Sequence, residues 1–190
     1  MLRDPERLRA ILTNPDRPVQ LVIAGKAHPA DDGGKALIQQ VVRFTEDPEL
    51  RDRMIFLPDY DISMARHIYA GCDVWLNNPR RPLEACGTSG MKAALNGALN
   101  CSILDGWWDE GFTPDAGYKI ADNGIYPNDT PDDARENFES DALYTLIEQE
   151  LVPDFYQRTN GVPTRWTSRM KSCIAKLAPE FSTNRMVAEY

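Results

Sequence analysis

One short stretch of the chain holds most of the residues whose types and spacing could do chemistry. It runs from Glu84 to Gly97 and reads E-A-C-G-T-S-G-M-K-A-A-L-N-G. Residues 84–90 are small and polar and include glycine, so their backbone can approach a ligand closely and offer N–H groups to it. Residues 91–99 are rich in helix formers, with apolar side chains at helical spacing. A loop that leads into a helix N-terminus in this way predicts an anion-binding site.

Lys92 is the residue of this stretch that most needs an explanation. We expect it in the first turn of the helix, where the helix dipole favours negative rather than positive charge. A bound phosphate, or conversion of the amine to a neutral or delocalised imine, would compensate for that misplacement. The alternative is a first-turn lysine without a role.

Glu84 and Cys86 each have a functional and a plain interpretation. Glu84 could bind a ligand, or it could be a loop carboxylate or a cap close to the helix. Cys86 could be a nucleophile beside a helix N-terminus. Because the chain has only two histidines that could activate it, we interpret Cys86 as a small loop residue.

The elements around this stretch alternate between strand and helix. Apolar runs predict four strands, and amphipathic segments predict helices between them; the strands are 19–24, 53–57, 72–76 and 100–104, and the helices 31–44, 63–70 and 91–99. The nearly unbroken apolar run at 19–24 predicts a strand buried on both faces, and we expect Leu37 to face inward from the helix at 31–44. Short links between such elements predict the α/β class, a parallel sheet with flanking helices. Ligands bind beyond the carboxyl ends of such strands, and the loop at 84–90 follows the third strand.

The rest of the chain is predicted to be a polar segment followed by helices. Residues 113–135 carry many Asp, Asn, Gly and Pro and predict a long surface loop. Helices follow over about 139–190: the first is interrupted at Val152-Pro153, the second spans 163–177 with Ile174 on its apolar inner face, and Ser182 or Thr183 caps the last. We expect residues 1–190 to be a single, incomplete domain cut from a longer chain.

Composition narrows the classes of function. A net charge of −8 argues against nucleic acid or an anionic membrane as a partner, and no apolar run approaches the roughly 20 residues that span a bilayer. The four cysteines lack CxxC spacing and indicate reduced thiols in a cytoplasmic protein. With two histidines and no carboxylate cluster at ligand spacing, we expect no metal site.

The central stretch and three other segments together resemble one known family. The motif E-A-C-G-T-S-G-M-K-A-A-L-N-G, followed by N-C-S-I-L-D-G, is similar to the pyridoxal-phosphate motif of the α-glucan (glycogen, starch and maltodextrin) phosphorylases. Weaker matches follow the family's order: I-A-G-K-A-H-P, I-F-L-P-D-Y and, at the end, F-S-T-N-R-M-V-A-E-Y. The wording D-G-W-W-D-E-G and G-T-S-G-M-K resembles the bacterial short form, and Trp107-Trp108 are interpreted as packing residues rather than a sugar platform.

The resemblance implies a Rossmann-like domain, the cofactor-carrying half of a two-domain GT-B glycosyltransferase. Lys92 would carry pyridoxal 5'-phosphate as a Schiff base. Other cofactor contacts would come from Thr88, Ser89, Gly90 and Tyr60. Substrate contacts to the hydroxyls of the transferred glucosyl unit would come from Glu84 and from the backbone N–H groups of Ala85, Cys86 and Gly87.

The chemistry that the resemblance implies is retaining transfer of glucose from the end of an α-1,4-glucan to inorganic phosphate, which releases glucose 1-phosphate. The phosphate of the cofactor would exchange a proton with the substrate phosphate, which protonates the leaving glycosidic oxygen. A phosphate group suits that role because its second pKa is about 6. Lys92 and Glu84 are the residues we would call catalytic.

Two departures from the family pattern bear on activity. The basic segment that would bind substrate phosphate would precede Met1, in the missing N-terminal domain. Asp61 stands where long family members carry an arginine. We therefore expect these 190 residues to be inactive alone. A homodimer stays open for the full-length enzyme.

Two rival functions remain. A nucleotide-sugar glucosyltransferase of the glycogen-synthase type has the same two-domain architecture and a glutamate in this loop, but carries an acid where this chain has Lys92. A non-catalytic glucan-binding remnant is the other, and glucan retention without cofactor absorbance would favour it.

Overall fold

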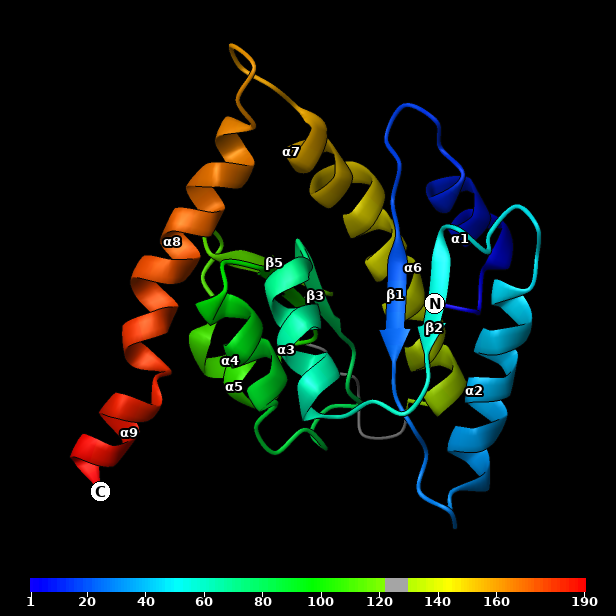
Figure 1. Cartoon of the computed structure of the whole chain (residues 1–190), viewed down its shortest axis with the longest axis horizontal. Coiled ribbons are helices and arrows are strands. Elements are labelled where there is room, and N and C mark those ends of the chain that lie inside the picture. Colours follow the sequence, from blue (N-terminus) through cyan, green and yellow to red (C-terminus); the bar gives the residue numbers. More distant parts are fainter. Residues whose placement is uncertain (122–129) are drawn as a thin grey trace. The chain divides into compact units, whose positions relative to one another are not determined.

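The computed structural model describes residues 1–121 and 130–190 (Figure 1). They divide into two compact units, Met1–Ala65 and Arg66–Tyr190, and each unit has its own parallel sheet. The α/β class with helices flanking parallel strands is therefore confirmed, but the strands pair as a two-stranded and a three-stranded sheet rather than as one. That residues 1–190 form a single domain stays a prediction.

The first unit is built on two parallel strands. Its elements are α1 (Pro5–Leu12), β1 (Leu21–Ala24), α2 (Asp32–Thr45) and β2 (Met54–Leu57). Each helix starts at an aspartate whose carboxylate accepts a backbone N–H: Asp4 from Arg7 at 2.9 Å and Asp31 from Gly34 at 2.8 Å. Five apolar residues form its buried core, namely Leu8, Leu12, Leu50, Met54 and Ala65.

Burial in the first unit is shallower than the sequence predicts. The first strand was expected to be buried on both faces, yet Val22 in β1 is 45% exposed. Leu37 was expected to face inward from α2, yet it is 61% exposed, and no residue of α2 is buried. A sheet of only two strands is too narrow to cover all of the apolar face of a helix.

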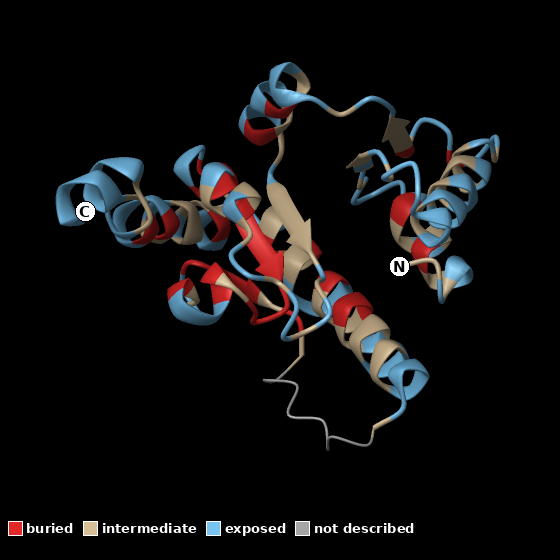
Figure 2. Cartoon of the chain, turned by 90° about the horizontal axis from the view of Figure 1, so that it is seen from below, coloured by how far each residue is buried: buried red, intermediate tan, exposed pale blue. Residues whose placement is uncertain are grey.

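The second unit contains the remaining elements. They are α3 (Ile62–Gly71), which begins within the first unit, and then β3 (Val74–Asn77), α4 (Thr88–Leu95), β4 (Leu99–Ser102), α5 (Trp107–Gly111), β5 (Gly117–Lys119), α6 (Asp132–Leu146), the π-helical turn η1 (Ile147–Leu151), α7 (Val152–Tyr156), α8 (Thr164–Glu180) and α9 (Thr183–Glu189). The sheet has the order β3-β4-β5. Its central strand, β4, is buried at every position (Figure 2).

Aromatic packing holds α5 against this sheet. Trp108 is fully buried, and its indole N–H donates to the carbonyl of Tyr118 at 3.1 Å. Trp107 is 4% exposed and meets the ring of Phe181 edge-on at 5.1 Å. The interpretation of both tryptophans as packing residues is confirmed.

Helix α8 covers α4 and the start of β4. The buried thiol of Cys173 lies 3.9 Å from the carbonyl oxygen of Ala94 and 3.8 Å from that of Ala98. Burial raises the pKa of Cys173 to about 11 and that of Cys101 to about 12, so both thiols stay protonated at neutral pH. All four cysteines of the chain are free thiols.

The prediction of a surface loop over 113–135 is wrong at both ends. Gly117–Lys119 form β5, Ala116, Tyr118 and Ile120 are buried, and α6 already begins at Asp132. Residues 122–129 of that predicted loop lie outside the described residues. A three-residue strand in a polar segment is too short to show a periodic pattern in the sequence. It is stabilised instead by pairing with β4 and by packing against Trp108.

The predicted break at Val152-Pro153 is also absent, since the described chain stays helical from Asp132 to Tyr156. The π-helical turn just before Pro153 shifts backbone bonding to the residue five positions back, which leaves room for the proline ring. The next helix, α8, likewise continues to Glu180 through Pro179. Ile174, expected on its inner face, is 46% exposed.

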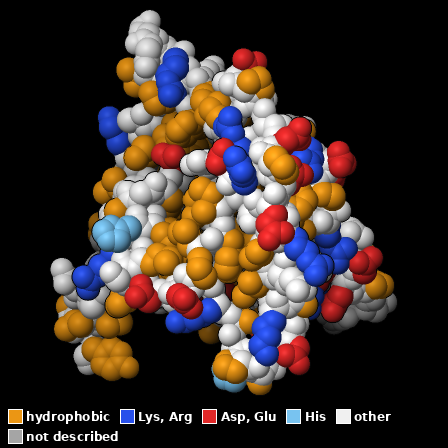
Figure 3. Space-filling view, turned by 45° about the vertical axis from the view of Figure 1, so that its right-hand side comes forward, with side chains coloured by type: hydrophobic (Ala, Val, Ile, Leu, Met, Phe, Trp, Pro, Cys, Tyr) orange, Lys and Arg blue, Asp and Glu red, His pale blue; other side chains and the backbone are white. Residues whose placement is uncertain are grey.

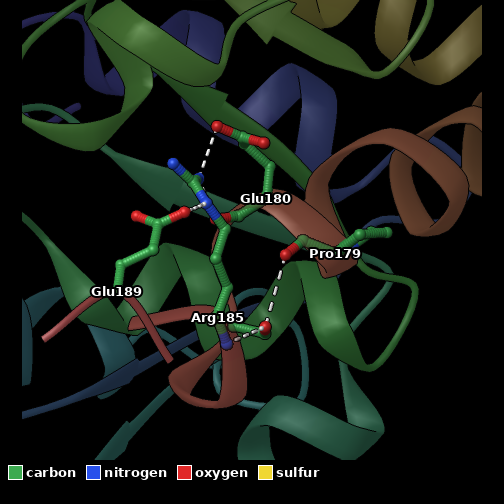
Figure 4. A network of polar contacts seen from close by, with 5 residues as sticks. Pro179, Glu180, Arg185 and Glu189 are labelled. Atoms are coloured by element: carbon green, nitrogen blue, oxygen red, sulfur yellow. Dashed lines mark hydrogen bonds and ion pairs between the residues drawn. The ribbon is translucent and has the colours of Figure 1, made fainter. Parts of the chain in front are cut away.

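The last helix begins as predicted. The Ser182 hydroxyl accepts the backbone N–H of Arg185 at 3.2 Å, which makes Ser182 the N-cap of α9. The guanidinium of Arg185 then holds the junction with α8, because it donates to Glu180 at 2.5 Å and to Glu189 at 2.8 Å (Figure 4).

A buried carboxylate ties α7, α8 and β5 together. Asp154 is 1% exposed, and its oxygens lie 3.0 Å from Arg165 Nε and 3.3 Å from Arg169 Nε. The Tyr118 hydroxyl donates to the same carboxylate at 3.1 Å. Burial raises the pKa of Tyr118, so this hydroxyl keeps its proton.

We expect Asp154→Ala to lower the free energy of unfolding by about 3 kcal/mol, because it leaves the mostly buried guanidinium of Arg169 without its carboxylate. Tyr118→Phe removes one hydrogen bond and should cost about 1 kcal/mol. Urea titration of each variant measures both values, with Glu150→Ala on the exposed π-helical turn as control. Equal losses of unfolding free energy in Asp154→Ala and Tyr118→Phe would contradict this account.

A surface ion pair predicts a weak dependence of stability on acid pH. Lys176 Nζ donates to both carboxylate oxygens of Asp115, at 2.7 and 2.8 Å. This bond, with smaller contributions from two hydroxyls, lowers the pKa of Asp115 from 3.8 to about 2. Because the folded chain lowers the pKa of this carboxyl, the ion pair stabilises the fold at pH values above 3.8. That stabilisation disappears as the pH falls from 3.8 towards about 2.

The difference in unfolding free energy between the native chain and Asp115→Asn should therefore shrink across that range. The effect is small because both side chains are exposed. Urea titrations at a series of pH values measure it, and a difference independent of pH would refute the pairing.

Candidate functional site

Helix α4 of the central stretch begins and ends earlier than its composition suggests. Gly87 adopts the left-handed conformation, with φ 83° and ψ 49°, and helical geometry starts at Thr88. A second left-handed glycine, Gly97 at φ 82°, follows the helix and leads into β4. Both positions suit glycine because side chains disfavour positive φ.

The prediction that Lys92 lies in the first turn is therefore wrong. Lys92 belongs to the last turn of the eight-residue helix, where the dipole favours a positive charge and no anion is needed to compensate. Its side chain is exposed, and its ammonium lies 5.9 Å from the centroid of the Tyr69 ring, which is a cation–π distance. The electrostatic argument for an imine falls away, and the motif carries the assignment of Lys92.

The loop that precedes α4 presents backbone and a carboxylate together. Ala85 and Cys86 are exposed, while Glu84 and Gly87 are half-buried. The Glu84 side chain folds back over Gly87, because a Cβ added to Gly87 would lie only 3.0 Å from Glu84 Oε1. A carboxylate accepts hydrogen bonds and N–H groups donate them, so the pair suits a ligand with several hydroxyls.

This loop is fastened to the turn that follows β4. The backbone N–H of Glu84 donates to the carboxylate of Asp105 at 2.9 Å, and the N–H of Trp107 donates to the carbonyl of Cys86 at 2.8 Å. The two segments meet because β3 and β4 are neighbouring parallel strands and end at the same edge. The sequence places Asp105 in one of the loops that follow strands, where ligands are expected, but it predicted no role for this carboxylate, since Asp-Gly after a strand is a common turn signal.

The underside of α4 has no room for a side chain at Gly90. The Asn100 side-chain amide donates to the Gly90 carbonyl at 3.1 Å. A Cβ added to Gly90 would lie 2.5 Å from Asn100 Oδ1 and 2.7 Å from Trp107 Nε1. Gly90 thus sets how closely the helix lies on β4.

The hydroxyl of Ser89 has a fixed donor. The indole N–H of Trp75 donates to Ser89 Oγ at 3.2 Å, and the Trp75 ring packs on Tyr69 at a centroid distance of 4.8 Å. The proton of the Ser89 hydroxyl can therefore point to another acceptor. Thr88 is exposed at the start of the helix. Trp75 and Tyr69 were missed because their sequence positions indicate only packing.

The predicted residue Tyr60 belongs to the first unit and follows β2. Its place beside a cofactor stays a prediction. The next residue, Asp61, accepts the backbone N–H of Met64 at 2.8 Å, so its carboxylate caps the start of α3.

Neither a metal-binding cluster nor a membrane-spanning helix is found among the described residues. In residues 1–121 and 130–190, no group of three or more His, Cys, Asp or Glu side chains is arranged to hold a metal ion. Within those ranges, no helix has the length and apolarity needed to cross a membrane.

We expect Gly90→Ala to lower the free energy of unfolding by about 1–3 kcal/mol, because its methyl group must displace buried side chains. Gly33→Ala is the matched control, since in α2 the added Cβ meets only Asp31 Oδ1 at 3.6 Å and alanine favours helix. Chemical denaturation compares the two variants. Equal changes in stability would contradict the close packing of α4.

Comparisons with known proteins agree with this geometry. A family model described as carbohydrate phosphorylase matches residues 6–108. The whole chain is 55% identical to a glycogen phosphorylase of Mycobacterium tuberculosis and 46% identical to a maltodextrin phosphorylase of Thermococcus litoralis, and it covers 22% of each. A glycogen phosphorylase of Aquifex aeolicus is 46% identical over 98% of the chain and is covered to 26%.

The chain thus spans about a quarter or less of the length of these relatives. The matched residues include the loop at 84–87, all of α4 and the turn after β4. This chain belongs to the carbohydrate phosphorylase family.

Proposed function

We propose that this chain is part of an α-1,4-glucan phosphorylase, a pyridoxal-phosphate-dependent glycosyltransferase. It would transfer the terminal glucose of glycogen or a maltodextrin to inorganic phosphate and release glucose 1-phosphate. One observation carries the proposal. This chain belongs to the phosphorylase family, and its loop and helix from Glu84 to Lys92 follow β3 at the carboxyl edge of the sheet.

The residues present fit pyridoxal phosphate. Lys92 is exposed and has the primary amine that would attach it. The start of α4 offers the hydroxyls of Thr88 and Ser89 and the first-turn N–H groups, donors that suit a phosphate. Gly90 keeps this turn close to the sheet, and the family resemblance adds Tyr60 as a cofactor contact. When bound, pyridoxal phosphate supplies a phosphate group that holds or gives up a proton near neutral pH.

The residues of the chain would supply positioning. Glu84 would accept hydrogen bonds from the glucosyl hydroxyls, and the N–H groups of Ala85, Cys86 and Gly87 would donate to them. The Ser89 proton would point to the cofactor phosphate, because Trp75 already donates to the Ser89 oxygen. Together these groups would hold the reacting sugar and the phosphates in one orientation, which is a large part of catalysis.

A second domain would complete the site, as the GT-B architecture requires. Large apolar side chains of this chain reach its surface between charged ones (Figure 3); Ile62, Leu83 and Val187 are 76%, 75% and 65% exposed. Surface of this kind supports contact with further protein. The basic segment that binds the substrate phosphate would come from the N-terminal domain. Asp61, which stands where long family members carry an arginine, is acidic and caps α3.

The nucleotide-sugar rival remains disfavoured because Lys92 stands in place of an acid and the matched relatives are named phosphorylases. A cytoplasmic location is supported by the four free thiols. A homodimer of the full-length enzyme stays a prediction.

In the full-length polypeptide that carries this segment, we expect Lys92→Ala to lose pyridoxal phosphate, because the amine that attaches it is gone. Its thermal midpoint without added cofactor should stay close to that of the cofactor-free parent. Cofactor absorbance after desalting and a thermal melt measure the two effects. Lys171→Ala, an exposed lysine of α8, is the control and should retain the cofactor. A Lys92→Ala protein that keeps the absorbance, or that no longer folds, would contradict the assignment.

A further inference from the structure

We propose that the turn Asp105-Gly106-Trp107 orients the glucosyl-binding N–H groups of the loop 84–87, and that Asp105 is its positioning residue. The inference depends on the proposed function of that loop. It assigns to the segment after β4 a role in sugar recognition without any contact of its own to the sugar.

Among residues 1–121 and 130–190, the carboxylate of Asp105 accepts hydrogen bonds from backbone N–H groups and from no side chain. The side chain is 8% exposed. One oxygen accepts the N–H of Glu84 at 2.9 Å, and the other accepts the N–H of Gly106 at 3.0 Å. A charged acceptor binds N–H groups more strongly than a neutral one, so Asp105 fixes the start of the loop to its own turn.

Gly106 lets the turn approach the loop closely. It has φ 53° and ψ −136°, a combination that side chains disfavour. A Cβ at this position would lie 2.5 Å from the carbonyl oxygen of Cys86 and 3.0 Å from that of Glu84. Both loop carbonyls therefore face the turn, and the Cys86 carbonyl accepts the N–H of Trp107 at 2.8 Å.

The direction of these carbonyls decides the direction of the neighbouring N–H groups. In a planar trans peptide the C=O and the N–H point in opposite ways. Because the carbonyls of Glu84 and Cys86 face the turn, the N–H groups of Ala85 and Gly87 point away from it. These are two of the three N–H groups proposed to bind the sugar, so the turn determines how they are presented.

Asp154, a second buried carboxylate of this unit, shows what a purely structural role looks like. Asp154 pairs with the side chains of Arg165, Arg169 and Tyr118 and joins separate elements. Asp105 instead bonds the backbone of the loop that carries Glu84. Its loss should change how the loop binds a sugar more than it changes the fold.

The test uses the full-length enzyme and the isosteric change Asp105→Asn. An asparagine can accept one of the two N–H groups, but its NH₂ then faces the other donor. We expect the KM for glucose 1-phosphate to rise about tenfold, since small displacements of binding groups are costly, while cofactor content is unchanged. Gly106→Ala, which pushes on the Cys86 carbonyl, should give the same pattern. Glu110→Gln, an exposed carboxylate on α5, should leave KM unchanged.

A set of monodeoxy glucose 1-phosphates distinguishes positioning from general damage. In the parent enzyme, removing a hydroxyl that the loop binds should weaken binding of glucose 1-phosphate. The same removal should weaken binding less in Asp105→Asn, because the displaced N–H groups no longer reach that hydroxyl. An unchanged KM, an unchanged set of deoxy-sugar penalties, or loss of cofactor together with the fold would each overturn the inference. A parent enzyme without cofactor or phosphorolysis would instead refute the proposed function.

Discussion

The second unit depends on the close approach of two segments that follow neighbouring parallel strands. Two hydrogen bonds join the loop after β3 to the turn after β4: the Glu84 N–H donates to the Asp105 carboxylate, and the Trp107 N–H donates to the Cys86 carbonyl. Gly106 permits this approach because any side chain would collide with the loop carbonyls. Glycine conformations thus hold the loop, and the loop carries the groups that would recognise a sugar.

Packing is equally close beneath α4. Gly90 lies against Asn100 and Trp107, so the helix rests directly on the buried central strand. Trp75 reaches Ser89 from β3, and Tyr69 lies beside the Lys92 ammonium. Neighbouring elements therefore contact this short helix on several sides, while Thr88 and Lys92 are exposed on it, an arrangement that suits the proposed cofactor site.

The sequence predicted the elements that repeat a pattern and missed those that depend on contacts. The four apolar strands and the Ser182 cap were visible from residue type. The strand at Gly117–Lys119 was not, because its stability comes from β4 and Trp108. The start of α4 was misplaced since the left-handed Gly87, rather than helix propensity, sets it. For the candidate site, the motif proposes Glu84 and Lys92, whereas Asp105 and Trp75 contact this stretch through spatial neighbours that no spacing in the sequence reveals.

The position of Lys92 in the last turn of α4 gives its charge no need of a bound anion, so the motif around it supports its proposed role without help from the helix dipole. A lysine in a last helical turn is ordinary, so only chemistry can show that it is special. The most direct measurement is borohydride reduction of the full-length enzyme saturated with pyridoxal phosphate, followed by peptide mass mapping. This account predicts a reduced pyridoxyl adduct on the peptide that contains Lys92. An unmodified Lys92 in that intact, saturated enzyme would contradict its central claim.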